Sequence, residues 1–458
     1  MRGILRKTGL YVSVIALLLT ACGGGNSDKG AGSSAGSNST NGSGSSGASN
    51  AGSDVVTIEI WGWNPNEENG QIYVNAFNQS HTDIQIKYVQ SEYNDYLNKL
   101  KLGMLTGEGP DLFGVQAGEM LVQYAEFMED LTPYAEAAWG ANWADRFYEF
   151  GLTQLQKNGK TQALPFFMSA AGYLWYNKTI LDAHGLQPPA TFEEWVQLSR
   201  QLNEKGVTPF IQGAKDSWVN FDMFIALANE ISPGKIYEAE AGTVPWTDPD
   251  LVEAMRYWKR LFDEGIMQKG ALGVSQYPDM HDKWAKGESV MILFGTWNND
   301  HMTKETIERL KTTLGVKEDY QFMPLRFPDI NGDGQPGRLF GGPDVGWAMN
   351  KNSKNKEAAW RVLEWLESEE AQQVHAKQLN VPGIKGIPLD DSNVMFEEQK
   401  EVLKWVLEDV DNMIGKREFL YPELKTALGD ALQMVAAGQT SPEDALANVE
   451  NVSRSISR

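Results

Sequence analysis

Three apolar segments decide the fold: VVTIEIW at residues 55–61, IQIKYV at residues 84–89 and DLFGV at residues 111–115. In the first two segments branched and aromatic residues recur at every second position, which is the period of a β-strand. The intervals between the segments carry apolar residues at helical spacing, as in Leu97, Leu100 and Met104. The order strand, helix, strand, helix, strand predicts a parallel sheet with helices on its faces, and therefore an α/β fold.

The loops after these three strands carry the side chains expected of a polar binding site. Ligands bind to such sheets beyond the carboxyl ends of the strands, where the loops come together. Here the loops span residues 62–66, 90–92 and 116–119. They contain one large aromatic ring and several amides and carboxylates: Trp63, Asn64, Asn66, Gln90, Gln116 and Glu119. All six side chains are candidates for contact with a ligand.

A second α/β unit is predicted to begin near residue 164. Thr191 with Glu194 has the pattern of a helix start, and so has Asp248 followed by Pro249. Residues 289–294 are a continuous apolar run, as expected of a strand that is covered on both faces. The last third of the chain is predicted to be mostly helical, at residues 356–379, 397–412, 423–437 and from 441 onward.

Cys22 is the only cysteine in the 458 residues, and it follows the features of a secretory signal. Basic residues near the start precede an apolar core at residues 12–19 and two small residues, which is the order found in signal peptides. The sequence Leu19-Thr20-Ala21-Cys22 resembles the lipobox of bacterial lipoproteins. Residues 1–21 are therefore predicted to be a signal peptide, and Cys22 a lipid anchor on the outer face of the cytoplasmic membrane. The alternative is a secreted protein with an unmodified cysteine.

Residues 22–54 are rich in glycine, serine and asparagine, and they are predicted to form a flexible linker. The whole chain has 61 acidic and 40 basic residues and a net charge of −21. This charge argues against nucleic acid as a partner and against direct binding to an anionic membrane surface. One cysteine excludes a disulfide within the chain, so we expect a monomeric body that is stabilised by its hydrophobic core.

Several segments, in this order, resemble the sugar-binding solute-binding proteins of bacterial ABC importers, the family related to maltose-binding protein. The segments are GPDLF at 109–113, GYLWYNK at 172–178, GLQPPATFEEW at 185–195, and residues 286–297, 352–360 and 437–446. The resemblance implies a two-lobed periplasmic-binding-protein fold, in which each lobe has a mostly parallel sheet with flanking helices. It places one lobe at residues 55–163 plus 297–345, and the other at residues 164–296 plus 346–458, with a hinge between them.

The resemblance also implies a ligand, a partner and further site residues. The ligand would be a carbohydrate of oligosaccharide size, and the partner the transmembrane subunits of an ABC permease. Trp297 matches a tryptophan that stacks on sugar in relatives, and Asn298 follows it. Relatives place a ring near Trp218, and Gly342 and Asp344 fall in the hinge-side loop. Of the six loop residues named above, the resemblance implies ligand contact for Trp63, Asn64, Gln116 and Glu119. Residues 167–170 lack a glutamate that some relatives carry there, which weakens an assignment to maltodextrins.

These residue types suit a sugar. A pyranose has an apolar C–H face, which a tryptophan ring matches, and a rim of hydroxyl groups, which carboxylates and amides match with directional hydrogen bonds.

Residues 329–335 match the first half of a calcium-binding loop. Asp329, Asn331 and Asp333 place oxygen atoms at alternating positions, and Gly334 occupies the sixth position. The twelfth position, where a bidentate glutamate is expected, is Phe340. Half a motif supplies too few ligands, so a glycine-rich turn is favoured over a calcium site, and no cofactor is expected.

An enzyme and a binding protein for another solute are the alternatives. A glycosidase needs two carboxylates that flank the scissile bond, and with 61 acidic residues the composition does not exclude such a pair. Outside the glycine-rich linker the chain has no nucleophile-elbow motif. It has no His-Glu-x-x-His, and its five histidines show no metal-ligand spacing. Carboxylates beside aromatic rings would also suit a polyamine, and a peptide stays open. We predict a carbohydrate-binding protein that is not an enzyme.

Overall fold

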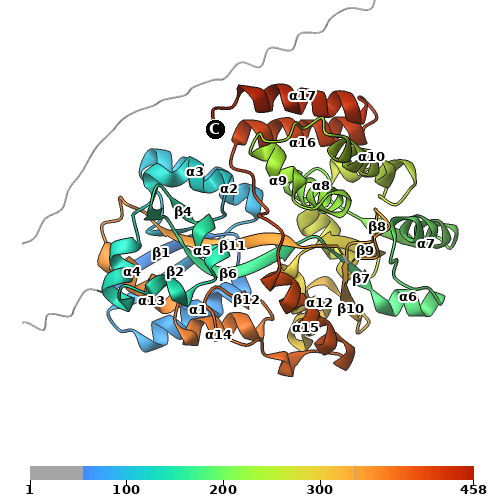
Figure 1. Cartoon of the computed structure of the whole chain (residues 1–458). Coiled ribbons are helices and arrows are strands. Elements are labelled where there is room, and N and C mark those ends of the chain that lie inside the picture. The colour runs from blue at the N-terminus through green and yellow to red at the C-terminus, as the bar shows by residue number, and fades with distance from the viewer. Residues whose placement is uncertain (1–54, 336) are drawn as a thin grey trace, which may run out of the picture. The chain divides into compact units, whose positions relative to one another are not determined.

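The computed structural model of the protein describes residues 55–335 and 337–458, which fold around two β-sheets (Figure 1). The six strands of the first sheet, in the order β12-β6-β11-β3-β1-β2, are β1 (Val56–Gly62), β2 (Ile84–Gln90), β3 (Leu112–Val115), β6 (Leu164–Ala171), β11 (Phe340–Met349) and β12 (Val381–Pro382). The four strands of the second sheet, in the order β10-β7-β9-β8, are β7 (Tyr173–Asn177), β8 (Thr208–Ile211), β9 (Ser289–Phe294) and β10 (Phe322–Arg326). The first sheet and the helices that pack on it form what we call the first lobe. The second sheet and its helices form the second lobe.

Helices cover both faces of the first sheet. One face packs on α1 (Glu67–Ser80), α13 (Lys356–Leu366) and α14 (Glu369–Lys377). The other face packs on α2 (Tyr93–Thr106) and α3 (Glu119–Tyr124). The remaining elements up to β6 are α4 (Thr132–Trp139), α5 (Glu149–Gln154), β4 (Gln156–Lys157) and β5 (Lys160–Thr161).

The second lobe has a larger helical share. Its core includes residues of α6 (Lys178–His184), α7 (Phe192–Glu204), α8 (Ser217–Ile231), α9 (Lys235–Glu240), α10 (Pro249–Asp263), α11 (His281–Ala285), α12 (Lys304–Leu314), α15 (Glu397–Asp411), α16 (Pro422–Ala436) and α17 (Pro442–Ser455). α16 and α17 pack against each other and against α10 (Figure 1). No helix within residues 55–335 and 337–458 is long and apolar enough to cross a membrane.

The sequence patterns explain these elements well at the local level. β1 pairs in parallel with β2 and with β3, as the alternation at residues 55–115 predicts. α10 begins with Asp248, whose side chain accepts a hydrogen bond from the backbone N–H of Asp250, and Pro249 occupies its first position. The helix predicted at 356–379 is broken into α13 and α14 because the side chain of Ser368 caps a new helix start.

The sheets are mixed rather than mostly parallel. β11 runs antiparallel to both β3 and β6, and β7 runs antiparallel to β9 and β10. The reason lies in the chain path between the lobes. β6 of the first sheet leads directly into β7 of the second through Gly172, whose φ of +101° favours glycine.

The packing differs from the lobe boundaries implied by the sequence in two segments. α12 and β10, expected in the first lobe, bury Ile307, Leu310 and Phe322 in the core of the second lobe. The segment from 346 to 384, expected in the second lobe, packs on the first sheet through residues such as Trp360 and Leu363. Because β11 is hydrogen-bonded between β3 and β6, the chain that follows it enters the first lobe.

The buried face of α2 provides a test of this packing. Leu100 is fully buried, whereas Leu102 on the same helix is 65% exposed. We expect Leu100→Ala to lower the free energy of unfolding by about 2–5 kcal/mol because it leaves a cavity, and Leu102→Ala to change it by less than about 0.5 kcal/mol. Urea denaturation followed by circular dichroism measures both, and equal losses in the two variants would contradict the packing.

Candidate ligand-binding site

Asp344 lies at the centre of a buried polar network between the two lobes. A β-bulge in β11 pairs Pro343 and Val345 with β6 but leaves Asp344 without a partner there. The Asp344 carboxylate is 6% exposed. It accepts hydrogen bonds from Asn64 Nδ2 at 3.1 Å and from Gln116 Nε2 at 3.5 Å. Two of the loops predicted from the sequence therefore meet at one carboxylate.

Arg417 joins this network from the opposite lobe. Its side chain comes from the segment between α15 and α16, and its Nη1 lies 3.2 Å from Asp344 Oδ1. Its Nε and Nη2 donate to the two carboxylate oxygens of Asp222 on α8, each at 2.8 Å. One guanidinium thus holds a carboxylate from the second lobe in a bidentate pair and a carboxylate from the first sheet in a single contact.

Burial governs the electrostatics of this network. Burial raises the pKa of Asp222 and of Asp344 above the usual range of an aspartate, and the Arg417 guanidinium offsets only part of this effect. Burial disfavours the charge of Arg417, yet Asp222 and Asp344 outweigh it and raise the pKa of Arg417. Two buried carboxylates that share one cation leave acceptor capacity for a further donor.

Three half-buried rings form an aromatic cluster beside Arg417, which we define as Trp218, Tyr277 and Trp297. Trp218 stacks on Tyr277 with 6.1 Å between ring centres and an angle of 15°. Trp297 Nε1 donates to the Tyr277 hydroxyl at 3.2 Å. The guanidinium carbon of Arg417 lies 4.3 Å from the centre of the Trp297 ring, within the range of a cation–π interaction.

The first lobe contributes a second set of rings and a charged pair. Trp63 packs between Tyr93 and Tyr96, with ring centres 5.4 and 5.2 Å away, and the Tyr93 hydroxyl donates to Gln116 Oε1 at 2.7 Å. Glu119 lies 3.3 Å from Lys425 of α16.

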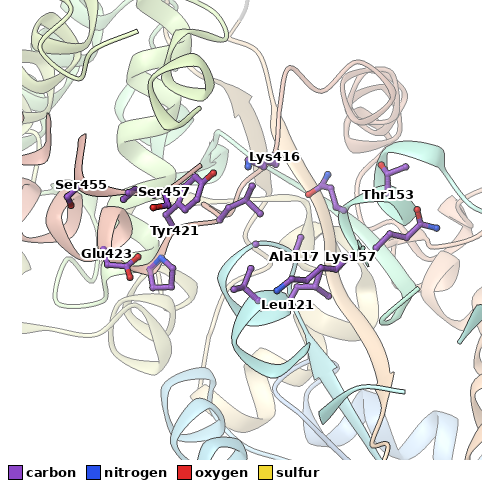
Figure 2. Close-up of a pocket in the computed structure, with 16 residues that line it drawn as sticks. Ala117, Leu121, Thr153, Lys157, Lys416, Tyr421, Glu423, Ser455 and Ser457 are labelled. Carbon is purple, nitrogen blue, oxygen red and sulfur yellow. The ribbon is translucent and has the colours of Figure 1, made fainter. Parts of the chain in front are cut away.

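The network adjoins a large groove. A small cavity is lined by Asp344, Arg417 and Gly342, and it shares Ala117 and Gln154 with a groove of about 920 Å³. Figure 2 shows Ala117 and Leu121 on one side of this groove and Tyr421 and Ser457 on the other. Gly342 has a φ of +151°, and a Cβ there would lie 2.6 Å from the Gln154 side chain, so both backbone and space favour glycine.

The structure brings all nine residues predicted to contact the ligand into or beside this region. They are Trp63, Asn64, Gln116, Glu119, Trp218, Trp297, Asn298, Gly342 and Asp344. Asn298 lies behind the aromatic cluster, where its Oδ1 accepts from the Tyr277 hydroxyl at 2.9 Å, and it is only 3% exposed. Cys22, the predicted lipid anchor, lies outside the described residues.

The candidate calcium loop lies elsewhere, next to α7. Asp329 accepts from the backbone N–H groups of Gly332 and Gly334, and Asn331 Oδ1 accepts from that of Asp333. Within the described part of the chain, no group of three or more His, Cys, Asp or Glu side chains is placed to hold a metal ion. The preference for a glycine-rich turn over a calcium site at Asp329, Asn331 and Asp333 stays a prediction.

Sequence reasoning missed three residues of the site, Arg417, Asp222 and Tyr277. Asp222 had a usable signal, because it is a charge within a helix whose neighbours Phe221 and Met223 are apolar, and a buried charge requires a partner. Arg417 had none, because a charged residue in a connection between helices is ordinarily solvated.

The Arg417 pairing predicts a strong effect on stability. Arg417→Met leaves Asp222 and Asp344 buried without their cation, so we expect the free energy of unfolding to fall by about 3–5 kcal/mol. Arg256→Met is the matched control, because Arg256 pairs with Glu253 and Glu443 at the surface, where ion pairs contribute little. Guanidinium denaturation measures both variants, and a small effect of Arg417→Met would contradict the pairing.

Comparison with known proteins identifies relatives of part of the chain. The chain is similar to an uncharacterized ABC transporter extracellular-binding protein of Pyrococcus horikoshii, at 25% identity over 256 residues, which are 54% of this chain and 57% of the relative. It is 31% identical over 140 residues, 30% of each protein, to the melibiose/raffinose/stachyose-binding protein of Bacillus subtilis. The chain thus spans less than two thirds of the length of these curated relatives.

A solved structure from work on xylan utilization by Caldanaerobius polysaccharolyticus has a similar fold. Its TM-score is 0.73 at 21% identity, over 86% of this chain and 99% of that chain. This likeness confirms the α/β fold class. The family model for bacterial extracellular solute-binding proteins matches residues 64–373, more than half of the sequence. The chain therefore belongs to the bacterial extracellular solute-binding protein family.

Proposed function

We propose that this protein captures an oligosaccharide between its two lobes and delivers it to the transmembrane subunits of an ABC permease. The observation that carries the proposal is the aromatic cluster beside Arg417, Asp222 and Asp344. A sugar needs an apolar ring for its C–H face and directional polar groups for its hydroxyls, and this region offers both.

The polar groups have capacity left for a ligand. The guanidinium of Arg417 has five N–H groups, of which three are engaged by Asp222 and Asp344. The remaining two are available to sugar hydroxyls. Asp344 and Gln116 add acceptors and donors from the first lobe.

The groove supports a ligand larger than one sugar. Its volume of about 920 Å³ lies near the upper end of the range of about 300–1,000 Å³ that is typical of ligand pockets. The groove separates Leu121 of the first lobe from Tyr421 of the second, so an oligosaccharide that lies in it would contact both. A ligand that contacts both lobes favours the state in which they are close, through its differential contacts.

The relatives support the carbohydrate class. A protein named for binding melibiose, raffinose and stachyose aligns with part of this chain, and a structure with this fold comes from work on xylan utilization. Membership of a solute-binding family also supports the proposal that the chain binds its sugar without changing it.

A melting screen tests this function. Raffinose, stachyose and xylo-oligosaccharides are added in turn, and a ligand at about 100 times its Kd should add about 2.7 kcal/mol to the free energy of unfolding. We expect Trp297→Ala to abolish the shift, because the ring loses its contact with the sugar face. Trp405→Ala is the control, because Trp405 packs on Tyr173 and Arg326, outside the site.

Chromatography of the same mixtures separates the classes of function. Unchanged sugar with a thermal shift is the expected result. New products would identify an enzyme, and a shift with spermidine or a peptide mixture but with no sugar would identify another solute. Either result would overturn the proposed function.

We further propose that Cys22 carries a lipid that holds the protein at the outer face of the cytoplasmic membrane. The support is the order of basic, apolar and small residues before Cys22. Cys22→Ser should release the protein into the medium while sugar affinity is unchanged. Cell fractionation with immunoblotting measures this, and a variant that stays with the membrane would contradict the anchor.

A further inference from the structure

Two histidines, of which His301 is buried and His281 half-buried, face each other behind the aromatic cluster. His281, at the start of α11, and His301, in the 3₁₀ helix Thr296–Met302, place their Nε2 atoms 3.0 Å apart. Their side chains are 15% and 5% exposed. Rings of Trp284, Phe294 and Phe322 surround the pair, so little water reaches it.

Each histidine is oriented by a carboxylate on its other ring nitrogen. His281 Nδ1 lies 3.0 Å from Asp282 Oδ1, and His301 Nδ1 lies 2.9 Å from Asp300 Oδ1. Burial disfavours the charge of Asp300, but His301 and Arg309 outweigh it and lower the pKa of Asp300 to about 2. An ionised carboxylate only accepts hydrogen bonds. His301 Nδ1 therefore carries a hydrogen, and the contact of His281 Nδ1 with Asp282 favours the same tautomer in His281.

The contact between the two rings then requires one more proton. If both rings were neutral with hydrogen on Nδ1, two Nε2 lone pairs would face each other at 3.0 Å. A hydrogen bond forms there only if one Nε2 also carries a hydrogen, which gives the pair three N–H protons and one positive charge. With Arg309, 3.1 Å from Asp300, this charge balances the carboxylates of Asp282 and Asp300.

No other charged group makes an ion pair with the two rings within the described residues. Glu68 of α1 lies 3.7 Å from Arg309 on its exposed side, and Tyr277 faces His281 from the preceding turn.

The pair supports the aromatic cluster through Tyr277. The His281 ring lies 5.3 Å from the Tyr277 ring at an angle of 31°. The Tyr277 hydroxyl accepts from Trp297 Nε1 and donates to Asn298 Oδ1. Trp297 and Asn298 belong to the same 3₁₀ helix as His301. The position of Trp297 therefore depends on the histidine pair through two connections, one through Tyr277 and one along the backbone.

We propose that His281 and His301 hold three N–H protons between them, one of which they share, and act as positioning residues for Trp297 and Tyr277. A fourth proton would separate the two rings, and this separation would weaken ligand binding. With four protons, two Nε2–H groups would face each other, and the contact would become repulsive. The protein would then hold its ligand at neutral pH and release it more readily in acid.

The sign of the pH dependence follows from burial and charge. Burial lowers the pKa of His281, and the neighbouring His301 lowers it further. The fourth N–H proton of the pair therefore binds below the usual histidine range near pH 6.5. Ligand affinity should be constant near neutral pH and fall by about tenfold in acid solution, as expected for the loss of one hydrogen bond to a charged group.

Nuclear magnetic resonance tests the pair without a ligand. In protein with ¹⁵N-labelled histidine we expect three N–H protons on the two rings at pH 7, one of them shared. In protein with 5-fluorotryptophan, the ¹⁹F signal of Trp297, assigned by Trp297→Phe, should move in a single acid step. Two N–H protons at pH 7, or a Trp297 signal that ignores the step, would overturn the proposal.

The variant His301→Gln separates positioning from mere packing. A glutamine amide can donate its N–H to neutral His281 Nε2 or accept from protonated His281 through its oxygen. The contact therefore survives acid, and we expect the acid step of the Trp297 signal to vanish in a folded protein. His184→Gln, in α6, is the control and should keep the step. An unchanged step in His301→Gln would contradict the pair, and if that variant does not fold, the proton count in the unaltered protein still decides.

The affinity measurement rests on the proposed function, whereas the resonance measurements do not. Calorimetric titration of the oligosaccharide found in the melting screen should give a Kd that rises about tenfold in acid for the unaltered protein and stays flat for His301→Gln. If the ¹⁹F signal of Trp297 moves in acid but no sugar binds at any pH, the result would support the histidine pair and overturn the proposed function. Equal acid dependence in both proteins would overturn the histidine pair alone.

Discussion

The contact of Arg417 with Asp222 and Asp344 is the interaction on which the rest of the structure depends. A buried charge is tolerated only with an opposite charge and full hydrogen bonding. Here one guanidinium serves carboxylates from both lobes. This contact explains two local features. The β-bulge in β11 frees Asp344 to face Arg417, and the charged Asp222 lies within the otherwise apolar α8. The segment between α15 and α16 places Arg417 between them, so the two lobes meet at a charged centre.

Around that centre the site combines two kinds of surface. The aromatic cluster offers ring faces, and the network of Asn64, Gln116 and Asp344 offers hydrogen bonds with fixed directions. Arg417 and Asp222 extend this network into the second lobe, so a ligand that binds there also links the two lobes. The histidine pair lies one layer further out and holds the rings through Tyr277. In this arrangement, protonation of the histidine pair would change the position of the aromatic cluster that contacts the ligand.

Local patterns in the sequence predicted much of the local structure, and several of the residues they single out lie in the candidate site. The alternation at residues 55–61 and 84–89 predicted β1 and β2. The ends of the strands at 55–61 and 111–115 predicted the loops of Asn64 and Gln116. Trp297 and Asp344 followed from the family resemblance. The return of the chain at 346–384 to the first lobe was missed, because β11 is paired on both sides by strands distant in sequence. Arg417 was missed for the same reason, since its role depends on partners 73 and 195 residues away.

A crystal structure of the protein with the oligosaccharide selected by binding tests the central claim most directly. The account predicts a sugar ring against Trp297 and sugar hydroxyls within hydrogen-bond distance of Asp344 or Arg417, with both lobes in contact with the ligand. Sugar bound at any other surface, with Trp297 and Asp344 out of contact, would contradict it.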